Sequence, residues 1–410
     1  MKIAIFSDSY LDLIGGIRSS IDAQKEALEK NGHEVIVFST GFPRSDTELQ
    51  QLEKKHIYKV PSCKLCFRGL TPVSRRPKII EEWIIKTHPE IKTYDIIYTH
   101  YEAGCSIAGL RLGKRLDIPT VQVMHGREDM GETNIIPRGF RTLVASFLNW
   151  FHSWYIPHPT KVHRDGFYAD GFAKAKMWEV MVNHANYADQ TITPSEHFRE
   201  KLIRYGATKD IKVIPNGYPD KDFPKDLAAK SLSSGSELKM IWHSRVSAEK
   251  RMMPFLRALC LVKGKYHLDV YGGGGDYFRA KRFAKNNQLN VIFHGNVSFD
   301  QIKEAISDVH LDVLVSYNFD TFGMTLIEAE AYNVPVFICD PDLKETVPPG
   351  SYTISTNENI EEMAETLNHL MKHPEKIAKM SEVMQKHRKE ILASKRIKSL
   401  EKLFNDIIKK

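Results

Sequence analysis

The most informative stretch of this 410-residue chain reads Ser316-Tyr-Asn-Phe-Asp-Thr-Phe-Gly-Met-Thr-Leu-Ile-Glu-Ala-Glu-Ala331. The apolar run Leu311–Ser316 predicts a buried strand, and a helix is expected to begin near Gly323. Because Gly323 has no Cβ, the backbone there could approach a bound ligand closely. The stretch therefore predicts a strand, a turn and a helix, which is the repeating unit of a parallel α/β sheet.

The turn and the start of this helix carry groups suited to a phosphorylated sugar. Asp320 lies in the turn, and Glu328 lies about two turns along the helix, where it could reach sugar hydroxyls. Free backbone N–H groups at a helix start favour phosphate, and here they belong to Met324, Thr325 and Leu326. The alternative is an ordinary strand–helix unit with surface acids, since such junctions are common.

The same alternation of strands and helices runs through the whole chain. In the first half, apolar runs predict strands at Lys2–Phe6, Glu34–Phe38, Asp95–Tyr98, Thr120–Met124 and Gln190–Thr193. In the second half they predict strands at Lys239–His243, His267–Tyr271, Val291–His294, Leu311–Ser316 and Pro335–Cys339. Helices are expected between them, including Arg18–Asn31, Gly104–Leu116 and Met252–Leu261. Strands and helices in this order indicate parallel sheets covered on both faces.

A polar segment rich in small residues, Asp226–Glu237, is the best linker between the two halves. We therefore expect two doubly wound, Rossmann-like α/β domains, residues 1–222 and 223–376, followed by charged helices in residues 377–410. Two such domains bind ligands in the cleft across which they face each other, at the carboxyl ends of the strands.

Composition indicates a globular protein. The chain is 42% hydrophobic and 27% charged, and its net charge of +7 fits an anionic ligand or an acidic membrane surface but is too weak an argument for nucleic acid. No stretch reaches 18 apolar residues, and Met1–Asp8 predicts a strand rather than a signal peptide. The five cysteines include one C-x-x-C pair, Cys63 and Cys66, without a second pair, so we expect a reducing cytosol and no metal or redox site.

Two glycine clusters follow expected strands. Gly15-Gly16 follows the first strand, and Gly272–Gly275, which includes Gly273, precedes Asp276. Neither matches the G-x-G-x-x-G fingerprint, so a dinucleotide cofactor is weakly supported. A tight turn remains the alternative for each cluster.

Positive charge also gathers at expected strand ends. Arg245 and Lys250 suit a diphosphate, because Arg forks onto two oxygens and Lys supplies a point charge. His125 and Arg127 place an imidazole and a cation at a strand end of the first half. The alternatives are a solvated charged loop and a structural histidine.

As a set, these motifs resemble those of the retaining glycosyltransferases of family 4, which have the GT-B fold. The resemblance covers nearly the whole chain, with the motifs in the same order and spacing. They are Gly15-Gly16, His125-Gly126, Pro215-Asn-Gly217, Arg245 with Glu249-Lys250, the glycines before Asp276, His294-Gly-Asn-Val-Ser298 and Asp320-x7-Glu328.

The resemblance implies a role for each matching position. Arg245 and Lys250 would bind the donor diphosphate and stabilise the charge that grows there as the sugar leaves. Glu328 would bind the ribose, Asp320 the 3- and 4-hydroxyls of the donor sugar, and His125 would lie near its C6 hydroxyl and anomeric centre. The expected catalytic residues are therefore His125, Arg245, Lys250 and Asp320.

The resemblance also implies how the rest of the nucleotide sugar is held. Gly16 would make room for the phosphates, and the glycine turn and His294 would shape the base pocket. No metal is expected, since Arg, Lys and the helix do its work. The expected binding residues are Gly15, Gly16, Arg245, Lys250, Gly273, His294, Gly323, Met324, Thr325, Leu326 and Glu328.

One position departs from the family pattern. The family usually has Glu where this chain has Asp320, whose side chain is one methylene shorter. The resemblance therefore implies the class of enzyme but leaves open which sugar the donor carries. For the mechanism we favour same-face attack, in which the leaving phosphate deprotonates the acceptor hydroxyl.

The acceptor pocket is expected in the first domain, which holds an unusual inserted segment, residues 127–182. Apolar residues follow helical spacing there, at Phe140, Leu143, Val144, Phe147, Leu148 and Phe151, with Trp150, Trp154 and Tyr155 alongside. With nearby basic residues, they could form a surface that enters an anionic leaflet. A core helix packed on the first sheet is the alternative, and a second basic region, Lys54–Arg76, could serve the same surface.

The order of parts resembles enzymes that glycosylate diacylglycerol or glucosyl-diacylglycerol at the inner membrane face. The resemblance thus implies UDP-glucose as donor, a lipid acceptor, a peripheral cytoplasmic location and a last helix that packs back on the first domain. A soluble or polyprenyl-linked acceptor in polysaccharide assembly is the rival within the class. A non-catalytic module that binds sugar nucleotides or lipids is the rival from another class.

Overall fold

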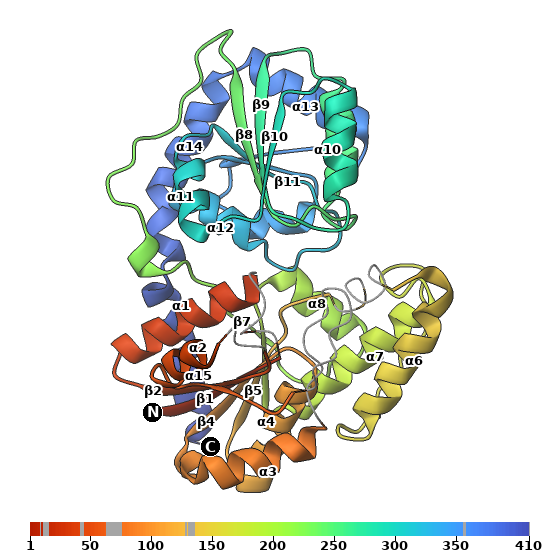
Figure 1. The fold of residues 1–410 in the computed structure, drawn as a ribbon, viewed down its shortest axis with the longest axis vertical. Coiled ribbons are helices and arrows are strands. Elements are labelled where there is room, and N and C mark those ends of the chain that lie inside the picture. The colour runs from red at the N-terminus through yellow and green to blue at the C-terminus, as the bar shows by residue number, and fades with distance from the viewer. Residues whose placement is uncertain are drawn as a thin grey trace. The chain divides into compact units, whose positions relative to one another are not determined.

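The computed structural model describes residues 1–8, 10, 16–41, 45–62, 76–127, 129, 136–355 and 358–409. The chain forms two compact units (Figure 1): unit 1 comprises Met1–Pro219 and Ala393–Lys410, and unit 2 comprises Asp220–Leu392. Residues 377–392, grouped with the C-terminal helices in the sequence analysis, lie in unit 2 instead. The reason is that Ile377 and Met380 are part of the unit 2 core.

Within the described residues, unit 1 contains a seven-stranded parallel sheet with the order β3-β2-β1-β4-β5-β6-β7. Its strands are β1 (Lys2–Ser7), β2 (Glu34–Ser39), β3 (Ile57–Lys59), β4 (Ile96–His100), β5 (Thr120–Val123), β6 (Gln190–Thr193) and β7 (Lys212–Val213). The order reverses between β1 and β4, and the carboxyl ends of strands at such a reversal commonly bind ligands.

Helices cover both faces of this sheet because side chains alternate along each strand. Ile3 and Ile5 face a core that includes residues of α1 (Gly16–Lys30) and α15 (Ala393–Ile408), and Figure 1 shows these two helices beside each other. Ala4 and Phe6 face a second core with residues of α3 (Pro77–Thr87) and α4 (Gly104–Leu116). Unit 1 also contains the helices α2 (Asp46–Glu53), α6 (Arg141–Ser153), α7 (Phe172–Tyr187) and α8 (Glu196–Arg204).

The last helix completes unit 1 through a close backbone contact. The N–H of Ala393 donates to the Tyr218 carbonyl at 2.8 Å. A Cβ on Gly217 would lie only 2.5 Å from the Ala393 Cα, so no other residue fits there without a shift. Asn216 joins α1 to the same loop, since its Oδ1 accepts a hydrogen bond from Ser20 Oγ at 2.8 Å.

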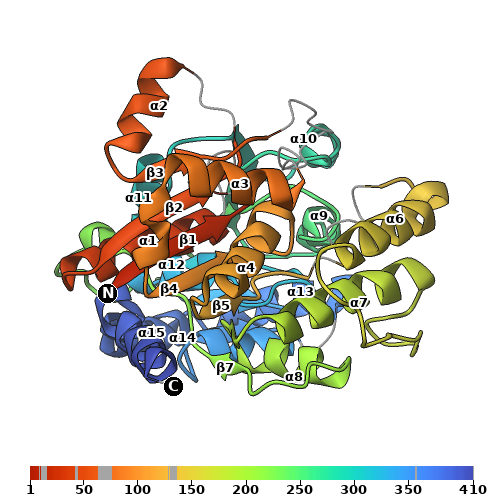
Figure 2. The ribbon, with the colours of Figure 1, turned by 90° about the horizontal axis from the view of Figure 1, so that it is seen from below.

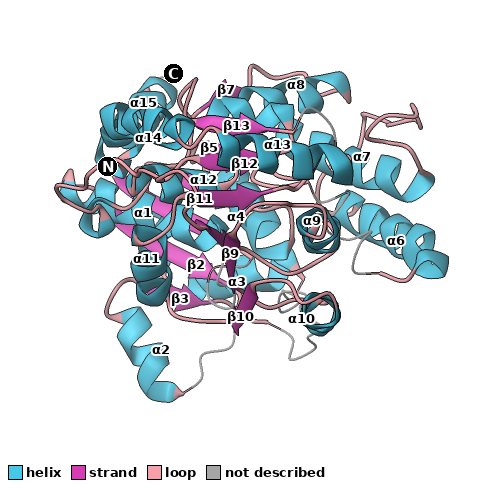
Figure 3. Cartoon of the chain, turned by 90° about the horizontal axis from the view of Figure 1, so that it is seen from above, coloured by secondary structure: helices cyan, strands magenta, loops and turns pink. Residues whose placement is uncertain are grey.

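Unit 2 contains, within the described residues, a six-stranded parallel sheet with the order β10-β9-β8-β11-β12-β13. The strands, magenta in Figure 3, are β8 (Leu238–His243), β9 (Tyr266–Tyr271), β10 (Val291–Gly295), β11 (Leu311–Leu314), β12 (Val336–Ile338) and β13 (Tyr352–Ile354). The helices are α9 (Met252–Leu259), α10 (Tyr277–Asn286), α11 (Phe299–Ser307), α12 (Met324–Ala331), α13 (Ile360–Lys372) and α14 (Glu375–His387). The prediction of an α/β fold with two doubly wound, Rossmann-like sheets is confirmed.

Some expected features lie outside the described residues. Both members of the C-x-x-C pair, Cys63 and Cys66, fall there, as does most of the second basic region. Among the helices that the structure does describe, none has the length and apolar character needed to cross a membrane.

Candidate functional site

The order of strands in unit 2 reverses between β8 and β11, and the loops after these two strands carry the main candidates. Lys250 comes from the loop after β8, and Asp320 from the loop after β11. Lys250 Nζ lies 2.7 Å from Asp320 Oδ1 and 2.9 Å from Asp320 Oδ2. Their side chains are only 11% and 13% exposed, and Ser316 Oγ also donates to Asp320. The structure thus pairs two candidates of opposite charge at the reversal point.

Arg245 lies on the same loop as Lys250 but reaches into solvent. Its side chain is 60% exposed, and Nη2 lies 3.1 Å from Glu249 Oε1. The ring of Phe319 lies near both cations, 6.0 Å from Arg245 Cζ and 5.5 Å from Lys250 Nζ. The ion pair therefore holds Lys250 in place, whereas the exposed side chain of Arg245 can change conformation. Arg245 is thus able to fold onto a bound anion.

Helix α12 begins at Met324, as expected, and no side chain caps its start. The Leu326 N–H, however, donates to the Gly323 carbonyl at 2.9 Å, so it is already used in this structure. Thr325 Oγ1 is buried and has no hydrogen-bond partner among the described residues. The start of the helix therefore offers an anion fewer N–H groups than the sequence predicted, with a buried hydroxyl beside them.

The reason for a glycine at position 323 differs from the one inferred from the sequence. Gly323 has φ +76°, a left-handed conformation that favours glycine. A Cβ there would lie 3.1 Å from side-chain carbons of Leu314 and Leu326. Backbone conformation and packing thus require this glycine without any ligand.

Glu328 belongs to a buried arrangement that the sequence analysis missed. His243, at the end of β8, lies between two acids: Nε2 is 3.1 Å from Asp312 Oδ2 and Nδ1 is 3.2 Å from Glu328 Oε2. Burial by itself would lower the pKa of His243, but Asp312 and Glu328 raise it to about 10. A charged imidazole therefore fixes the Glu328 carboxylate. An Asp inside the apolar strand β11 was the signal that could have revealed this group.

The glycines after β9 bring two loops together. A Cβ on Gly272 would lie 2.3 Å from the Ser244 carbonyl oxygen, and one on Gly274 would lie 2.4 Å from the Val246 carbonyl oxygen. The Val246 N–H donates to the Gly273 carbonyl at 2.8 Å. The cluster thus holds the loop that carries Arg245 and Lys250 against the end of β9.

His294, expected at the base pocket, lies at the end of β10 and is held from two sides. Its ring stacks on Tyr271, with centroids 4.3 Å apart and planes 4° apart. Its Nε2 lies 2.6 Å from Asp269 Oδ1. The His294 side chain is 32% exposed. Part of its ring therefore faces solvent, while Tyr271 and Asp269 hold the ring in place.

In unit 1, His125 lies just beyond the end of β5 and is buried against His100, the last residue of β4. The two rings stack with centroids 5.0 Å apart, and His125 Nε2 lies 2.7 Å from His100 Nδ1. Burial lowers the pKa of His125 to about 4, so the imidazole is neutral at pH 7. Such a group can exchange hydrogen bonds with a hydroxyl but carries no charge.

The other unit 1 candidates differ from the sequence expectation. Gly16 is the exposed first residue of α1, and Gly15 lies outside the described residues. Arg127 is not a cation at the rim, because it is buried and binds Asp129 through Nε at 2.8 Å and Nη2 at 2.6 Å. Its guanidinium also lies 4.8 Å from the Tyr168 ring centroid, so it stabilises the fold.

The candidates thus form two groups. Lys250, Asp320, Arg245, Glu328 and the start of α12 gather at the carboxyl edge of the unit 2 sheet, whereas His125 and Gly16 belong to the carboxyl edge of the unit 1 sheet. The unit 2 group can bind an anion through cations and backbone N–H groups, and hydroxyls through two carboxylates.

Comparison with known proteins assigns a family to each part of the chain. The sequence model described as Glycosyltransferase Family 4 matches residues 14–221, and the one described as Glycosyl transferases group 1 matches residues 225–387. An alpha-monoglucosyldiacylglycerol synthase of Acholeplasma laidlawii is 24% identical over 442 residues, covering 100% of this chain and 98% of the relative. A synthase of the same name from Streptococcus pneumoniae is 24% identical, covering 82% of this chain and 70% of the relative.

Solved structures resemble the whole chain. HepE of Anabaena, crystallised with UDP and glucose, has a TM-score of 0.70 at 17% identity and covers 99% of this chain and 100% of its own. A point mutant of TarM from S. aureus, crystallised with fondaparinux, alpha-GlcNAc-glycerol and UDP, has a TM-score of 0.69 at 14% identity and covers 98% of this chain and 99% of its own. At these identities the likeness shows a common fold.

Proposed function

The chain belongs to glycosyltransferase family 4 and has the GT-B fold, and from this premise we propose that it transfers glucose from UDP-glucose to diacylglycerol or a glycosyl-diacylglycerol. That the protein is a glycosyltransferase follows from its family. The lipid acceptor rests on one observation, the end-to-end match with an alpha-monoglucosyldiacylglycerol synthase. UDP is supported by its presence in the two related crystal structures.

The Lys250–Asp320 ion pair suggests how the donor enters. A nucleotide sugar brings both a diphosphate, which attracts Lys250, and hydroxyl groups, which can donate to Asp320. Each residue therefore exchanges its partner in the ion pair for a part of the donor, so that neither charge is left without a partner. Arg245 folds onto the diphosphate from solvent, and Glu328, fixed by His243, accepts hydrogen bonds from the ribose.

The transfer proceeds with retention of configuration, because an α-glycoside formed from an α-linked nucleotide sugar keeps its stereochemistry. The bond between the anomeric carbon and the phosphate oxygen breaks, and its electrons stay on the diphosphate, where Lys250 and the start of α12 stabilise them. The acceptor oxygen forms the new bond on the same face and gives its proton to the leaving phosphate. A donor analogue that traps a covalent sugar on a side chain would overturn this step.

The location follows from the two substrates. Nucleotide sugars are dissolved in the cytoplasm and diacylglycerol lies in the bilayer, so we place the enzyme peripherally on the inner face of the membrane. The net charge of +7 favours a surface that contains anionic lipids.

The test is transfer from radiolabelled UDP-, GDP- and ADP-sugars to extracted membrane lipids, with soluble sugars assayed alongside. We expect label in the lipid phase from UDP-glucose, and its loss in Lys250→Ala. Label that appears only in soluble oligosaccharide would overturn the lipid acceptor and favour glycan assembly. Tight donor binding with neither hydrolysis nor transfer would overturn the enzymatic role at this site.

A further inference from the structure

Helix α6 carries several large apolar side chains on its outer side. It packs along α7 (Figure 2), and the residues that it buries there include Asn149 and His152. The side chains turned away from α7 are large and apolar. With the residues that flank the helix they form a row that we call the aromatic ridge: Phe140, Leu143, Phe147, Trp150 and Trp154, exposed by 61%, 68%, 55%, 50% and 55%. An ordinary surface helix has one apolar stripe, which faces the core. Helix α6 packs Ala145, Leu148 and Phe151 inward and has a second apolar stripe, the ridge, on its outer side.

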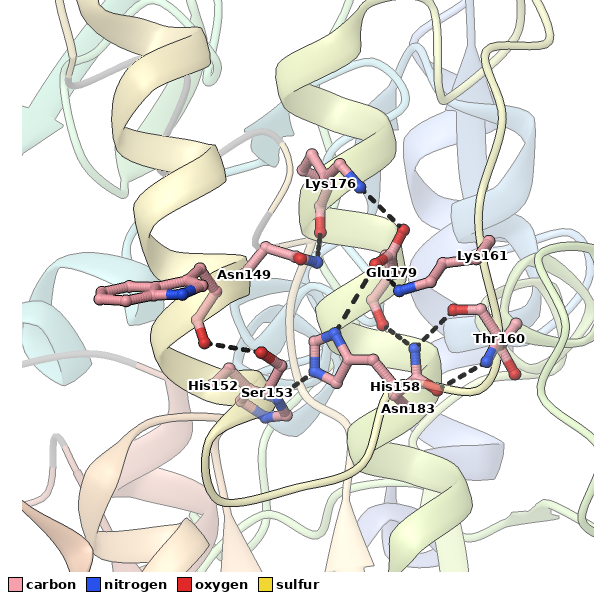
Figure 4. Close-up of polar contacts among 10 residues, drawn as sticks. Asn149, His152, Ser153, His158, Thr160, Lys161, Lys176, Glu179 and Asn183 are labelled. Atoms are coloured by element: carbon pink, nitrogen blue, oxygen red, sulfur yellow. Dashed lines mark hydrogen bonds and ion pairs between the residues drawn. The ribbon is translucent and has the colours of Figure 1, made fainter.

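Polar contacts on the buried side fix α6 in this orientation, as Figure 4 shows. Asn149 Nδ2 donates to the Lys176 carbonyl at 3.1 Å. His152 Nδ1 lies 2.6 Å from His158 Nε2. The other ring nitrogen of His152 lies 3.0 Å from Nδ1 of His184, a residue that Figure 4 does not draw. Turning the ridge inward would leave these buried polar groups without partners, at a cost of about 1–3 kcal/mol for each group. The exposure of the ridge is therefore built into the fold.

The ridge is continuous along the helix. Its members are spaced by three and four residues in alternation, which places them on one face. Neighbouring rings touch: the centroids of Trp150 and Trp154 are 4.1 Å apart, and those of Phe147 and Trp150 are 5.9 Å apart. A contiguous exposed apolar surface of this kind indicates a binding site.

The part of the chain that holds the ridge and α7 has a net positive charge. From Thr133 to Arg164 the chain contains no Asp or Glu. Arg141 begins the helix that carries the ridge, and Lys174 and Lys176 lie on α7, which packs along it. The next acids are engaged. Asp165 accepts from Tyr205 at 2.8 Å, and Asp170 lies 2.8 Å from Lys174 Nζ. The buried Glu179 lies 3.0 Å from Lys161 Nζ and 3.2 Å from Lys176 Nζ (Figure 4). The surface thus combines Trp and Phe side chains with net positive charge.

We propose that the aromatic ridge binds a lipid bilayer that contains anionic lipids, with its rings at the level of the headgroups. Trp, Phe and Leu on one face of a helix beside basic residues are the features of interfacial helices. Two copies of this chain joined through the ridge would bring like charges together, which disfavours self-association. The proposal deepens the proposed function by naming the surface that brings the enzyme to a lipid acceptor, and it rests on that function only for the identity of the acceptor.

The experiment measures binding to vesicles that hold no acceptor. The full-length protein is floated with vesicles of phosphatidylcholine alone or with a third of phosphatidylglycerol. We expect binding to the anionic vesicles, quenching of Trp150 and Trp154 by brominated lipid, and at least tenfold weaker binding of a Leu143→Ser, Phe147→Ser, Trp150→Ser variant. The matched control is Phe278→Ser on α10, because Phe278 is 80% exposed but lies outside the ridge. All replaced side chains are exposed, so thermal unfolding should match that of the wild type.

Several outcomes would overturn the proposal. Equal loss in the Phe278→Ser control would show that any exposed apolar residue suffices. If the wild type does not bind the vesicles, the proposal fails. If the ridge variant changes the oligomeric state of the protein instead, the ridge binds another partner, such as a second copy of the chain. If the ridge binds vesicles but no membrane lipid is glycosylated, the acceptor assignment fails while the membrane surface stands.

Discussion

The loops at the carboxyl ends of the two sheets differ in their charges. In unit 2, Lys250 and Asp320 form an ion pair and Arg245 reaches solvent beside them. In unit 1, His125 stacks on His100 in a buried and neutral pair, and the one cation that the sequence suggested there, Arg127, is neutralised by Asp129. For the function proposed above, we infer a division of roles from this difference: unit 2 would bind the charged diphosphate, and unit 1 would offer neutral hydrogen-bonding groups to an uncharged acceptor or sugar.

Removing the partly buried Lys250 cation of unit 2 tests this division most strongly. We expect Lys250→Ala to lower kcat by about 10²–10³-fold, the usual effect of losing one group that stabilises developing charge. The measurement is transfer at saturating donor. Lys281→Ala, an exposed lysine on α10, is the control and should retain wild-type activity.

Because Lys250→Ala leaves Asp320 without its cation, lost stability could imitate lost catalysis. The double variant Lys250→Ala, Asp320→Ala removes both charges, and its melting temperature should recover while its activity does not. Recovery of activity in the double variant would contradict a role for Lys250 in the reaction and would remove the contrast between the two units.

The neutral pair of unit 1 can be tested by acid. His125 has a native pKa of about 4, whereas an unfolded histidine titrates near 6.5. The unfolded chain therefore binds a proton that the native state does not, and stability falls with pH below about 6.5. From pH 7.5 to pH 5 this one residue should lower the free energy of unfolding by about 2 kcal/mol.

Urea unfolding at both pH values measures this effect. His125→Asn should show the smaller loss between pH 7.5 and pH 5, whereas His373→Asn, at a surface position, should behave as the wild type does. If His125→Asn loses as much stability in acid as the wild type, the imidazole is charged in the native state. Unit 1 would then carry charge as unit 2 does.

The smallest expected effect concerns His243, which fixes Glu328. We expect His243→Asn to raise the KM for the donor by about tenfold, or about 1.4 kcal/mol, with kcat within a factor of about three, because ribose binding is weakened equally in the ground and transition states. His373→Asn is the control, because His373 also lies beside an acid, Glu375 at 3.5 Å, but contacts none of the candidate site residues that the structure describes. A fall in kcat with an unchanged KM would place His243 in the chemical step instead.

The pH dependence of His243 has the opposite sign to that of His125. Its native pKa of about 10 lies above the unfolded value, so its contribution to stability is complete below pH 6.5 and is lost as the pH rises through 10. The donor KM of the wild type should therefore show no change from this group between pH 6 and pH 9.

Much of the fold was predictable, because hydrophobic periodicity is strong in buried strands. The strand Gln190–Thr193 and the helix Gly104–Leu116 have the predicted bounds. The strands Ile57–Lys59 and Tyr352–Ile354 were missed, since three residues at the edge of a sheet are too few to show a pattern. Their place is set by pairing with a neighbouring strand.

The sequence predicted which loops carry the candidate residues, but not which of their side chains contact one another. Lys250 and Asp320 are 70 residues apart, and only the strand order brings them together. The structure adds a reason for the glycines that the sequence does not reveal: Gly272 and Gly274 allow two backbones to meet. Likewise, helical spacing identified the apolar residues of α6 but left open which side faces outward, since the buried partners of Asn149 and His152 come from other segments.

The two-part composition of unit 1 has a consequence for how the chain is made. Leu400, Leu403 and Phe404 of α15 belong to the same core as Ile3 and Ile5 of the first strand. The ribosome therefore synthesises all of unit 2 before it synthesises α15, whose residues close the core of unit 1. The N-terminal part of unit 1 therefore stays partly open until α15 has been synthesised. Loss of residues 393–410 would therefore damage the first sheet, far away in sequence, rather than the unit that precedes them.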